Sequence, residues 1–255
     1  MGFCRKVFCR NRRKFRCFID QSRDMSNDPV MSTNNSFYQW FLDHITLHDH
    51  DDEKEELLNG LTHLLGGGLS LVALPAILIK ALGGGNSSLL AAGLVFGLSM
   101  ILLYFSSGMY HLVSGPVAKR VMRIMDHTTI YILIAGTYTP IMVYLGTSEA
   151  MIVLWTVWGL AAAGFFFTIF FWGRYGFLHV LFYLGMGWIV LLVWQTLREV
   201  VPPGLVHWTI AGGVTYTAGT IVYGLKMIPF YHAIWHLFVM GGSACFFIGI
   251  YQNLL

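Results

Sequence analysis

Charged residues become scarce in this chain after residue 60. Only ten of its 29 Lys, Arg, Asp and Glu side chains lie in the last 195 residues. A soluble domain carries about a quarter of charged residues, which it needs to cover its surface. The chain is 56% hydrophobic, and its mean hydropathy is +0.62. We therefore expect the part after residue 60 to be solvated by lipid.

Seven apolar runs after residue 60 have the length, about 17–25 residues, that a helix needs to cross a bilayer. Short breaks rich in Gly, Pro and Asn separate most of them, as helix ends require. The predicted fold class is an all-α membrane protein with a seven-transmembrane helix bundle. The expected spans are Leu61–Leu82, Leu89–Leu112, Thr128–Leu145, Met151–Phe171, Phe177–Leu197, Val206–Leu225 and Tyr231–Tyr251.

The distribution of Lys and Arg predicts the orientation of this bundle, because these residues are enriched on the cytoplasmic side. The N-terminal segment and the loops after the second, fourth and sixth expected spans carry fourteen of them. The opposite side carries only Lys80 and Arg198. We therefore expect a cytoplasmic N-terminus and a C-terminus outside, in a multi-pass protein of the plasma membrane or bacterial inner membrane.

Composition divides the chain into three expected regions. Residues 1–35 are basic and polar, which is typical of a disordered segment. Residues 36–59 are predicted as a juxtamembrane amphipathic segment, with a helix along the membrane over Phe37–Leu58, and residues 60–255 as the transmembrane domain. The scarcity of basic residues after residue 60 argues against a nucleic-acid partner. The four cysteines match neither a zinc motif nor a disulfide framework.

Histidines collect on the side expected to be cytoplasmic. Seven of the ten follow residue 60, and six of those fall at span ends on that side. His232 and His236 are four residues apart, so both imidazoles project from one helix face. Ser107 and His111 have the same spacing at the end of the second expected span, and Asp126 lies at the start of the third.

This set has the composition of a catalytic zinc site. Three histidine nitrogens and a water form a common catalytic ligand set, in which Zn²⁺ lowers the pKa of that water. A nearby carboxylate such as Asp126 can hold the water and act as general base, and Ser107 can donate a supporting hydrogen bond. Each residue alone has a structural explanation: an incidental His pair, a packing hydroxyl, or a helix N-cap at Asp126. Together they favour a metal site with His111, His232 and His236 as ligands.

A second group precedes the first expected span. Glu56, Asn59 and His63 lie three and then four residues apart, so a helix would place them on one face. They either cap and anchor the helix at the membrane interface or line the mouth of the same cavity. The sequence leaves both interpretations open.

These residues together resemble the three signature motifs of the progestin and adipoQ receptor family. The runs Tyr104–Leu112 and Met125–Pro140 look especially like its hemolysin III branch, and the resemblance covers about Glu56 to Leu255. It implies a seven-helix fold with a cytoplasmic N-terminus and zinc bound by three histidines near the cytoplasmic face, with an Asp holding the zinc-bound water. The matching motifs here are Glu56-x2-Asn59-x3-His63, Ser107-x3-His111 with Asp126, and His232-x3-His236.

Three functions are compatible with this sequence. The first is zinc-dependent hydrolysis of a membrane lipid. The resemblance implies an amide, since the wider superfamily includes alkaline ceramidases. The second is a pore-forming cytolysin, which the hemolysin name implies, although no wide charged stripe that could line a pore is present. The third is a receptor-like sensor with a structural zinc. The sequence indicates neither the lipid nor an oligomeric state.

Overall fold

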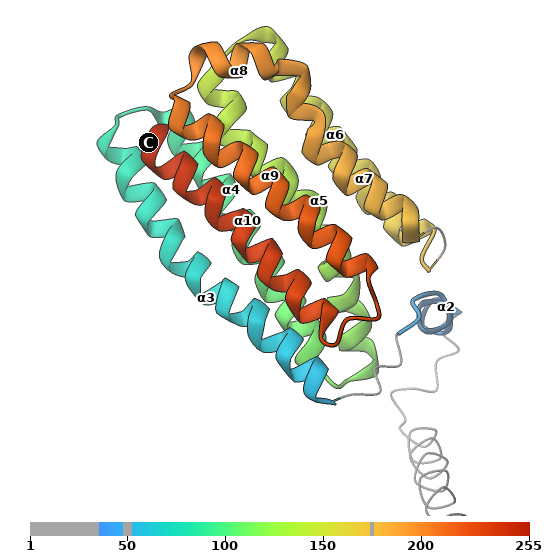
Figure 1. Cartoon of the computed structure of the whole chain (residues 1–255). Helices are drawn as coiled ribbons and strands as arrows, with labels where there is room; N and C mark the ends of the chain where they lie inside the picture. Colours follow the sequence, from blue (N-terminus) through green and yellow to red (C-terminus); the bar gives the residue numbers. More distant parts are fainter. Residues whose placement is uncertain (1–35, 48–52, 174–175) are drawn as a thin grey trace, which may run out of the picture. The chain divides into compact units, whose positions relative to one another are not determined.

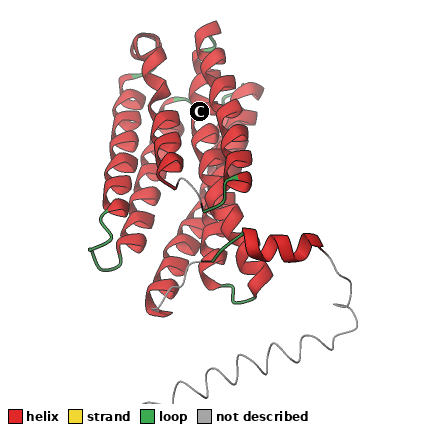
Figure 2. Ribbon diagram, turned by 90° about the vertical axis from the view of Figure 1, so that its right-hand side faces the viewer, coloured by secondary structure: helices red, strands yellow, loops and turns green. Residues whose placement is uncertain are grey.

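All described elements of the chain are helices. The computed structural model describes residues 36–47, 53–173 and 176–255, and Figure 2 shows helices and loops throughout these ranges. The chain forms two units, Met1–His44 and Ile45–Leu255. The first contributes α2 (Ser36–His44), and residues 1–35, expected to be disordered, lie outside the described residues. The all-α class is confirmed for the described part of the chain.

The second unit contains the remaining helices. Most are long, whereas one stretch is divided into an α-helix, a 3₁₀ turn and a short second α-helix. In chain order they are α3 (Glu53–Gly83), α4 (Ser87–Leu112), α5 (Pro116–Leu145), α6 (Ser148–Phe170), α7 (Gly176–Trp188), η2 (Ile189–Val193), α8 (Trp194–Val200), α9 (Pro203–Gly224) and α10 (Tyr231–Asn253).

Six stretches of helix are long and apolar enough to cross a membrane by length and composition. They are α3, α4, α5, α6, the stretch Phe177–Val200, and α10. The protein is therefore a multi-pass integral membrane protein. The remaining expected span, the sixth, Val206–Leu225, corresponds to α9, which has 22 residues but is less apolar, because threonines and tyrosines recur along it.

The helix expected over Phe37–Leu58 is wrong as a single element. α2 ends at His44, and α3 begins at Glu53, eight residues before the expected first span. The carbonyl oxygens of Ile45 and Thr46 accept hydrogen bonds from the side chains of Arg120 and Arg123 instead of continuing a helix. Acidic residues occupy the first turn of α3, where they interact favourably with the positive end of the helix dipole.

The first and last long helices of the second unit lie side by side, because α3 packs along α10. Each of them also packs along its neighbour in sequence, α3 along α4 and α10 along α9 (Figure 1). α3 and α4 approach closely because glycines face them: a Cβ on Gly60 would lie 2.5 Å from Leu112, and one on Gly108 only 2.9 Å from Leu64. This close contact brings the beginning of α3 against the end of α4.

A side chain from α5 interrupts the regular helix between α7 and η2. The Tyr138 hydroxyl donates to the carbonyl oxygen of Gly187 at 2.8 Å and accepts from the backbone N–H of Val190 at 2.8 Å. It therefore takes up backbone groups at the point where α-helical geometry gives way to a 3₁₀ turn. Insertion of a polar group into the backbone ladder is a recognised cause of such breaks.

Candidate metal centre

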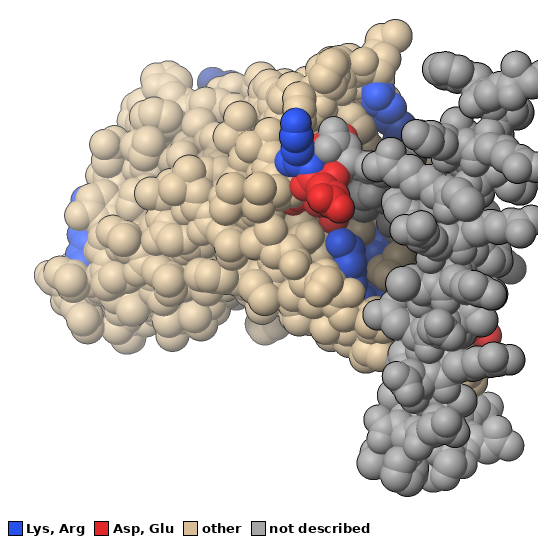
Figure 3. Space-filling model, turned by 90° about the horizontal axis from the view of Figure 1, so that it is seen from below, with Lys and Arg blue, Asp and Glu red and all other residues tan. Residues whose placement is uncertain are grey.

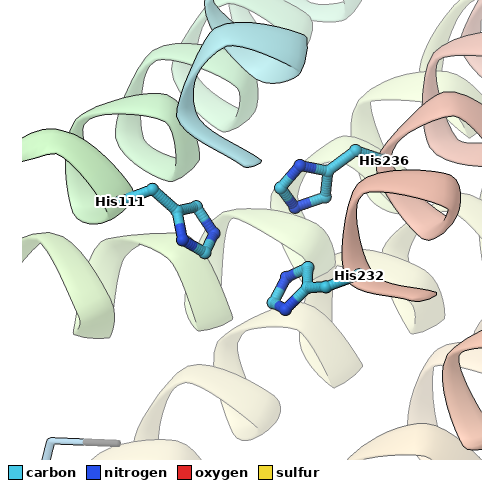
Figure 4. Close-up of side chains that lie close together, drawn as sticks. All are labelled: His111, His232 and His236. Atoms are coloured by element: carbon cyan, nitrogen blue, oxygen red, sulfur yellow. The ribbon is translucent and has the colours of Figure 1, made fainter. Parts of the chain in front are cut away.

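Three imidazoles converge where α4 ends and α10 begins. His111 comes from α4, and His232 and His236 come from successive turns of α10 (Figure 4). One ring nitrogen from each lies within 4.8 Å of the other two. His111 and His236 are 3% and 1% exposed, and His232 is partly buried. These three histidines, which the sequence predicts as ligands, therefore form a group that could hold a metal ion.

The spacing of the nitrogens suits a small tetrahedral ion. Zinc–nitrogen bonds of about 2.1 Å put two ligand nitrogens about 3.4 Å apart, so imidazole nitrogens within 4.8 Å of one another need to close by at most about 1.4 Å. Imidazole donors suit zinc, copper, iron and nickel. The buried donor set therefore fits a transition-metal ion.

Glu56 holds one of the three imidazoles. Its Oε1 lies 3.0 Å from Nδ1 of His111, and its Oε2 accepts a hydrogen bond of 2.9 Å from Nζ of Lys119. The Glu56 side chain is only 13% exposed. Because Glu56 engages Nδ1 of His111, a metal would be bound through Nε2. Seen from below, the described surface is almost uncharged, and acidic atoms gather beside basic ones (Figure 3).

The backbone of α3 holds a second imidazole. Nδ1 of His236 lies 3.1 Å from the carbonyl oxygen of Asn59 and 3.0 Å from Oγ1 of Thr62. The Thr62 hydroxyl can itself donate to the carbonyl oxygens of Leu58 and Asn59. The Nδ1–H of His236 is therefore directed at α3, and its Nε2 is the nitrogen that a metal would use. Sequence reasoning did not identify Thr62, because a threonine in an apolar run carries no distinguishing pattern.

Asn59 and His63 are both buried beside this cluster. Their exposed fractions are 1% and 3%. The His63 ring stacks on that of His236, with centroids 3.5 Å apart and planes 16° from parallel, and meets Tyr104 edge-on. Within the described part of the chain, the side-chain polar atoms of Asn59 and His63 make no hydrogen bond. Glu56, Asn59 and His63 thus all lie against the histidine cluster, on one face of α3.

Asp126 and Ser107 lie near His111. Ser107 is fully buried one turn before it, and Asp126, at 15% side-chain exposure, is near both Ser107 and His111. Oδ2 of Asp126 also lies 3.4 Å from Nδ1 of His127. Asp126 is not part of the group of three possible ligands. Its place beside that group suits a residue that holds a water or a proton.

His127 and His179 belong to separate contacts. Nδ1 of His127 lies 3.0 Å from the carbonyl oxygen of Arg123, and the His127 ring packs against Trp172. Nδ1 of His179 is hydrogen-bonded to the Tyr131 hydroxyl at 2.9 Å. Neither belongs to the group of three possible ligands.

Comparison with known proteins identifies the family. The model of the family described as "Haemolysin-III related" matches residues 52–247. The chain is 41% identical over 197 residues to the "Hemolysin-3 homolog" of Bacillus subtilis, covering 76% of this chain and 92% of that protein. It is 40% identical over 195 residues to "Hemolysin-3" of Bacillus cereus, covering 76% and 89% of the two chains.

A human protein also matches. The chain is 29% identical over 170 residues to the human "Monocyte to macrophage differentiation factor", covering 63% of this chain and 69% of that protein. The family match spans most of the transmembrane helices and all three histidines of the cluster. The chain therefore belongs to the haemolysin-III-related family, which confirms the hemolysin III branch of the progestin and adipoQ receptor family indicated by its motifs.

Proposed function

We propose that this protein is a zinc-dependent hydrolase of a membrane lipid amide. The observation that carries the proposal is the convergence of three imidazoles beside a carboxylate at one end of an apolar helix bundle. Neutral imidazoles with a further coordination position for water are typical of catalytic zinc sites. A receptor-like sensor with structural zinc would instead be expected to supply a fourth protein ligand, and among the described residues the group of possible ligands has three members.

Asp126 and Ser107 would carry the proton transfers. Bound zinc would supply a Lewis acid that polarises a carbonyl oxygen and lowers the pKa of a water molecule. Asp126 would take a proton from the attacking water as the C–O bond forms, and would return it to the nitrogen as the C–N bond breaks. The products are a carboxylic acid and an amine, and no oxidant or reductant is required. Ser107, buried beside Asp126, would orient its carboxylate.

An apolar cavity further along the bundle supports a lipid substrate. It has a volume of about 170 Å³ and is lined by residues of α5, α7, η2, α8, α9 and α10, among them Tyr138, Trp188 and Phe246. Phe246 lies ten residues beyond His236 on α10, a distance of about 15 Å along a helix. An acyl chain of roughly a dozen carbons could span that distance. We infer that the polar head reacts at the histidines and the tail lies in this direction.

We propose that α9 also spans the membrane, which brings the number of membrane-spanning helices to seven. It packs along α10, and its 22 residues correspond to about 33 Å, enough to cross a bilayer. Seven passes with a cytoplasmic N-terminus would put the histidine cluster at the cytoplasmic side of the plasma or bacterial inner membrane. Reporter fusions test this orientation: a periplasmic alkaline phosphatase fused after Leu255 should be active, and one fused after Asn86 should also be active. An inactive fusion after Leu255 would contradict the seven-pass topology.

The decisive experiment compares metal content and turnover in purified protein. We expect wild type to hold about one zinc and to release fatty acid from a panel of lipid amides, including ceramides of different chain lengths. Asp126→Ala should keep the zinc and lose turnover. Zinc binding without turnover on any lipid in that panel would refute the hydrolase assignment and leave the sensor.

The names of the two Bacillus relatives favour lysis as a second candidate. Release of a dye from lipid vesicles separates the two functions. If any dye release results from hydrolysis, His236→Ala should lose both zinc binding and dye release. Dye release that persists at the wild-type rate in that variant would support a cytolysin that does not depend on the metal.

A further inference from the structure

Two of the three candidate ligands are held by one face of a helix that supplies no ligand. Glu56 and Asn59 lie three residues apart on α3, at the positions where α4 and α10 approach it. The Glu56 carboxylate engages Nδ1 of His111, and the Asn59 carbonyl oxygen engages Nδ1 of His236. A helix from elsewhere in the chain therefore connects ligands that lie 125 residues apart in sequence.

The contact of Glu56 is the more specific of the two. A carboxylate can only accept a hydrogen bond from an N–H, so a neutral His111 must carry its proton on Nδ1. That tautomer leaves the lone pair on Nε2, the nitrogen on the far side of the ring from Glu56. Metal-binding histidines commonly use this arrangement, in which a carboxylate fixes the ring and raises the basicity of the ligating nitrogen.

Lys119 in turn fixes the carboxylate. Its ammonium lies 2.9 Å from Oε2, the oxygen that His111 does not use, and both side chains are largely shielded from solvent, at 20% and 13% exposure. A charged carboxylate at this depth needs such a partner. Lys119 belongs to α5, so the chain Lys119–Glu56–His111 connects three helices.

We propose that Glu56 is a positioning residue of the metal centre, which acts through the ring orientation and tautomer of His111 and is itself held by Lys119. Glu56 is not a ligand and does not touch the substrate. This proposal rests on the metal binding of the proposed function and is independent of whether the bound metal hydrolyses a lipid.

The test measures metal affinity in the purified full chain in detergent. Zinc is titrated in competition with a fluorescent chelator, and cobalt is titrated by its visible absorption, which reports ligand geometry. Loss of a carboxylate that orients a metal-binding histidine typically weakens binding 10–100-fold. We expect a loss in this range for Glu56→Ala, together with an altered cobalt spectrum. Glu53→Ala removes the same charge from an exposed position in the first turn and should leave both unchanged.

Two further variants separate hydrogen bonding from charge. Glu56→Asp keeps the charge but withdraws the carboxylate by one methylene, so it should bind metal about as weakly as Glu56→Ala. The double variant Glu56→Gln with Lys119→Met lacks both charges but keeps an amide oxygen that can accept the Nδ1–H of His111. It should recover most of the lost affinity. If Glu56→Asp binds metal nearly as tightly as wild type and the double variant binds weakly, the positioning role is overturned and Glu56 acts only through its charge.

Affinity that stays within threefold of wild type in Glu56→Ala would also overturn the proposal. Thermal unfolding of the metal-free protein shows whether Glu56→Ala folds. If it does not, the comparison of Glu56→Asp with the double variant tests the positioning role. The two proposals can fail separately. If the protein cleaves no lipid amide but its zinc affinity falls as expected in Glu56→Ala, the proposed reaction is refuted and the role of Glu56 stands.

Discussion

His63 stacks face to face on His236, with the two ring centroids 3.5 Å apart. His236 makes its Nδ1 contacts with Asn59 and Thr62, so the stack limits the remaining freedom of the ring. The packing of one imidazole thereby supports the orientation of another that is a candidate metal ligand.

This stacking predicts different effects for two substitutions of His63. His63→Phe keeps a planar ring and removes two buried nitrogens without partners in the described chain, each of which costs about 1–3 kcal/mol. It should keep or raise the melting temperature of the metal-free protein. His63→Ala leaves a void beside His236 and should lower stability by about 1–3 kcal/mol. Equal destabilisation by both would show that the polar atoms of His63, rather than its ring, are required.

Removing a candidate ligand should remove the metal. His111→Ala and His236→Ala are expected to lower the zinc content of purified protein from about one to near zero, measured by mass spectrometry of the metal. His207→Ala is the matched control, because His207 is exposed on α9 and outside the cluster. Unchanged zinc content in both ligand variants would place the metal elsewhere.

Metal binding should also stabilise the folded protein. An ion that binds only the native state at 100 times its dissociation constant adds about 2.7 kcal/mol. A chelator should therefore lower the melting temperature of wild type, and added zinc should restore it. The chelator should have little effect on His236→Ala. If neither the chelator nor added zinc changes the melting temperature of wild type, the protein does not hold a stabilising ion.

Ser107 and Ser106 provide a neighbouring pair for the proton-transfer step. Ser107 is fully buried near Asp126, whereas Oγ of Ser106 lies 3.0 Å from Oγ1 of Thr129. Ser107→Ala should retain zinc and lower the turnover of a lipid amide about 10-fold, which corresponds to roughly 1.4 kcal/mol. Ser106→Ala should lower stability by about 1 kcal/mol and leave turnover unchanged. Equal turnover in the two variants would exclude Ser107 from the reaction.

The hydrogen bonds of Tyr138 predict a local effect at the junction of α7 and η2. Tyr138→Phe removes the acceptor of the Val190 N–H and the donor to the Gly187 carbonyl oxygen. We expect a loss of about 1–3 kcal/mol, measured by thermal unfolding, and faster amide exchange at Val190. Tyr144→Phe, later on the same helix, is the control. If Tyr138→Phe loses no more stability than Tyr144→Phe, the Tyr138 hydroxyl does not stabilise the 3₁₀ turn between α7 and α8.

Much of the site could be predicted from the sequence because helices have a fixed period. The spacing of His232 and His236 puts two imidazoles on one face. The short connection between α4 and α5 makes them neighbours, and Asp126, ten residues into α5, packs near His111. The partner of Glu56 could not be predicted in this way. It depends on which residues of α4 and α5 come opposite α3, and spacing within one helix does not determine that.

Two features of the backbone could also not be predicted from the sequence pattern. The break between α2 and α3 coincides with carbonyl groups that accept hydrogen bonds from Arg120 and Arg123 of a distant helix. The 3₁₀ turn η2 lies within a continuous apolar run and depends on Tyr138 from α5. In both places a group from elsewhere in the chain competes with the local helical hydrogen bonds.

The sequence by itself determined the solvent of this protein and the chemistry available to it. So few charges after residue 60 require a lipid environment, and the same scarcity makes Asp126 stand out beside the histidines. Only the tertiary structure decided which atoms face one another. The roles of Glu56, Asn59 and Thr62 depend on the packing of α3 against α4 and α10, because hydrogen bonds need partners within about 3 Å.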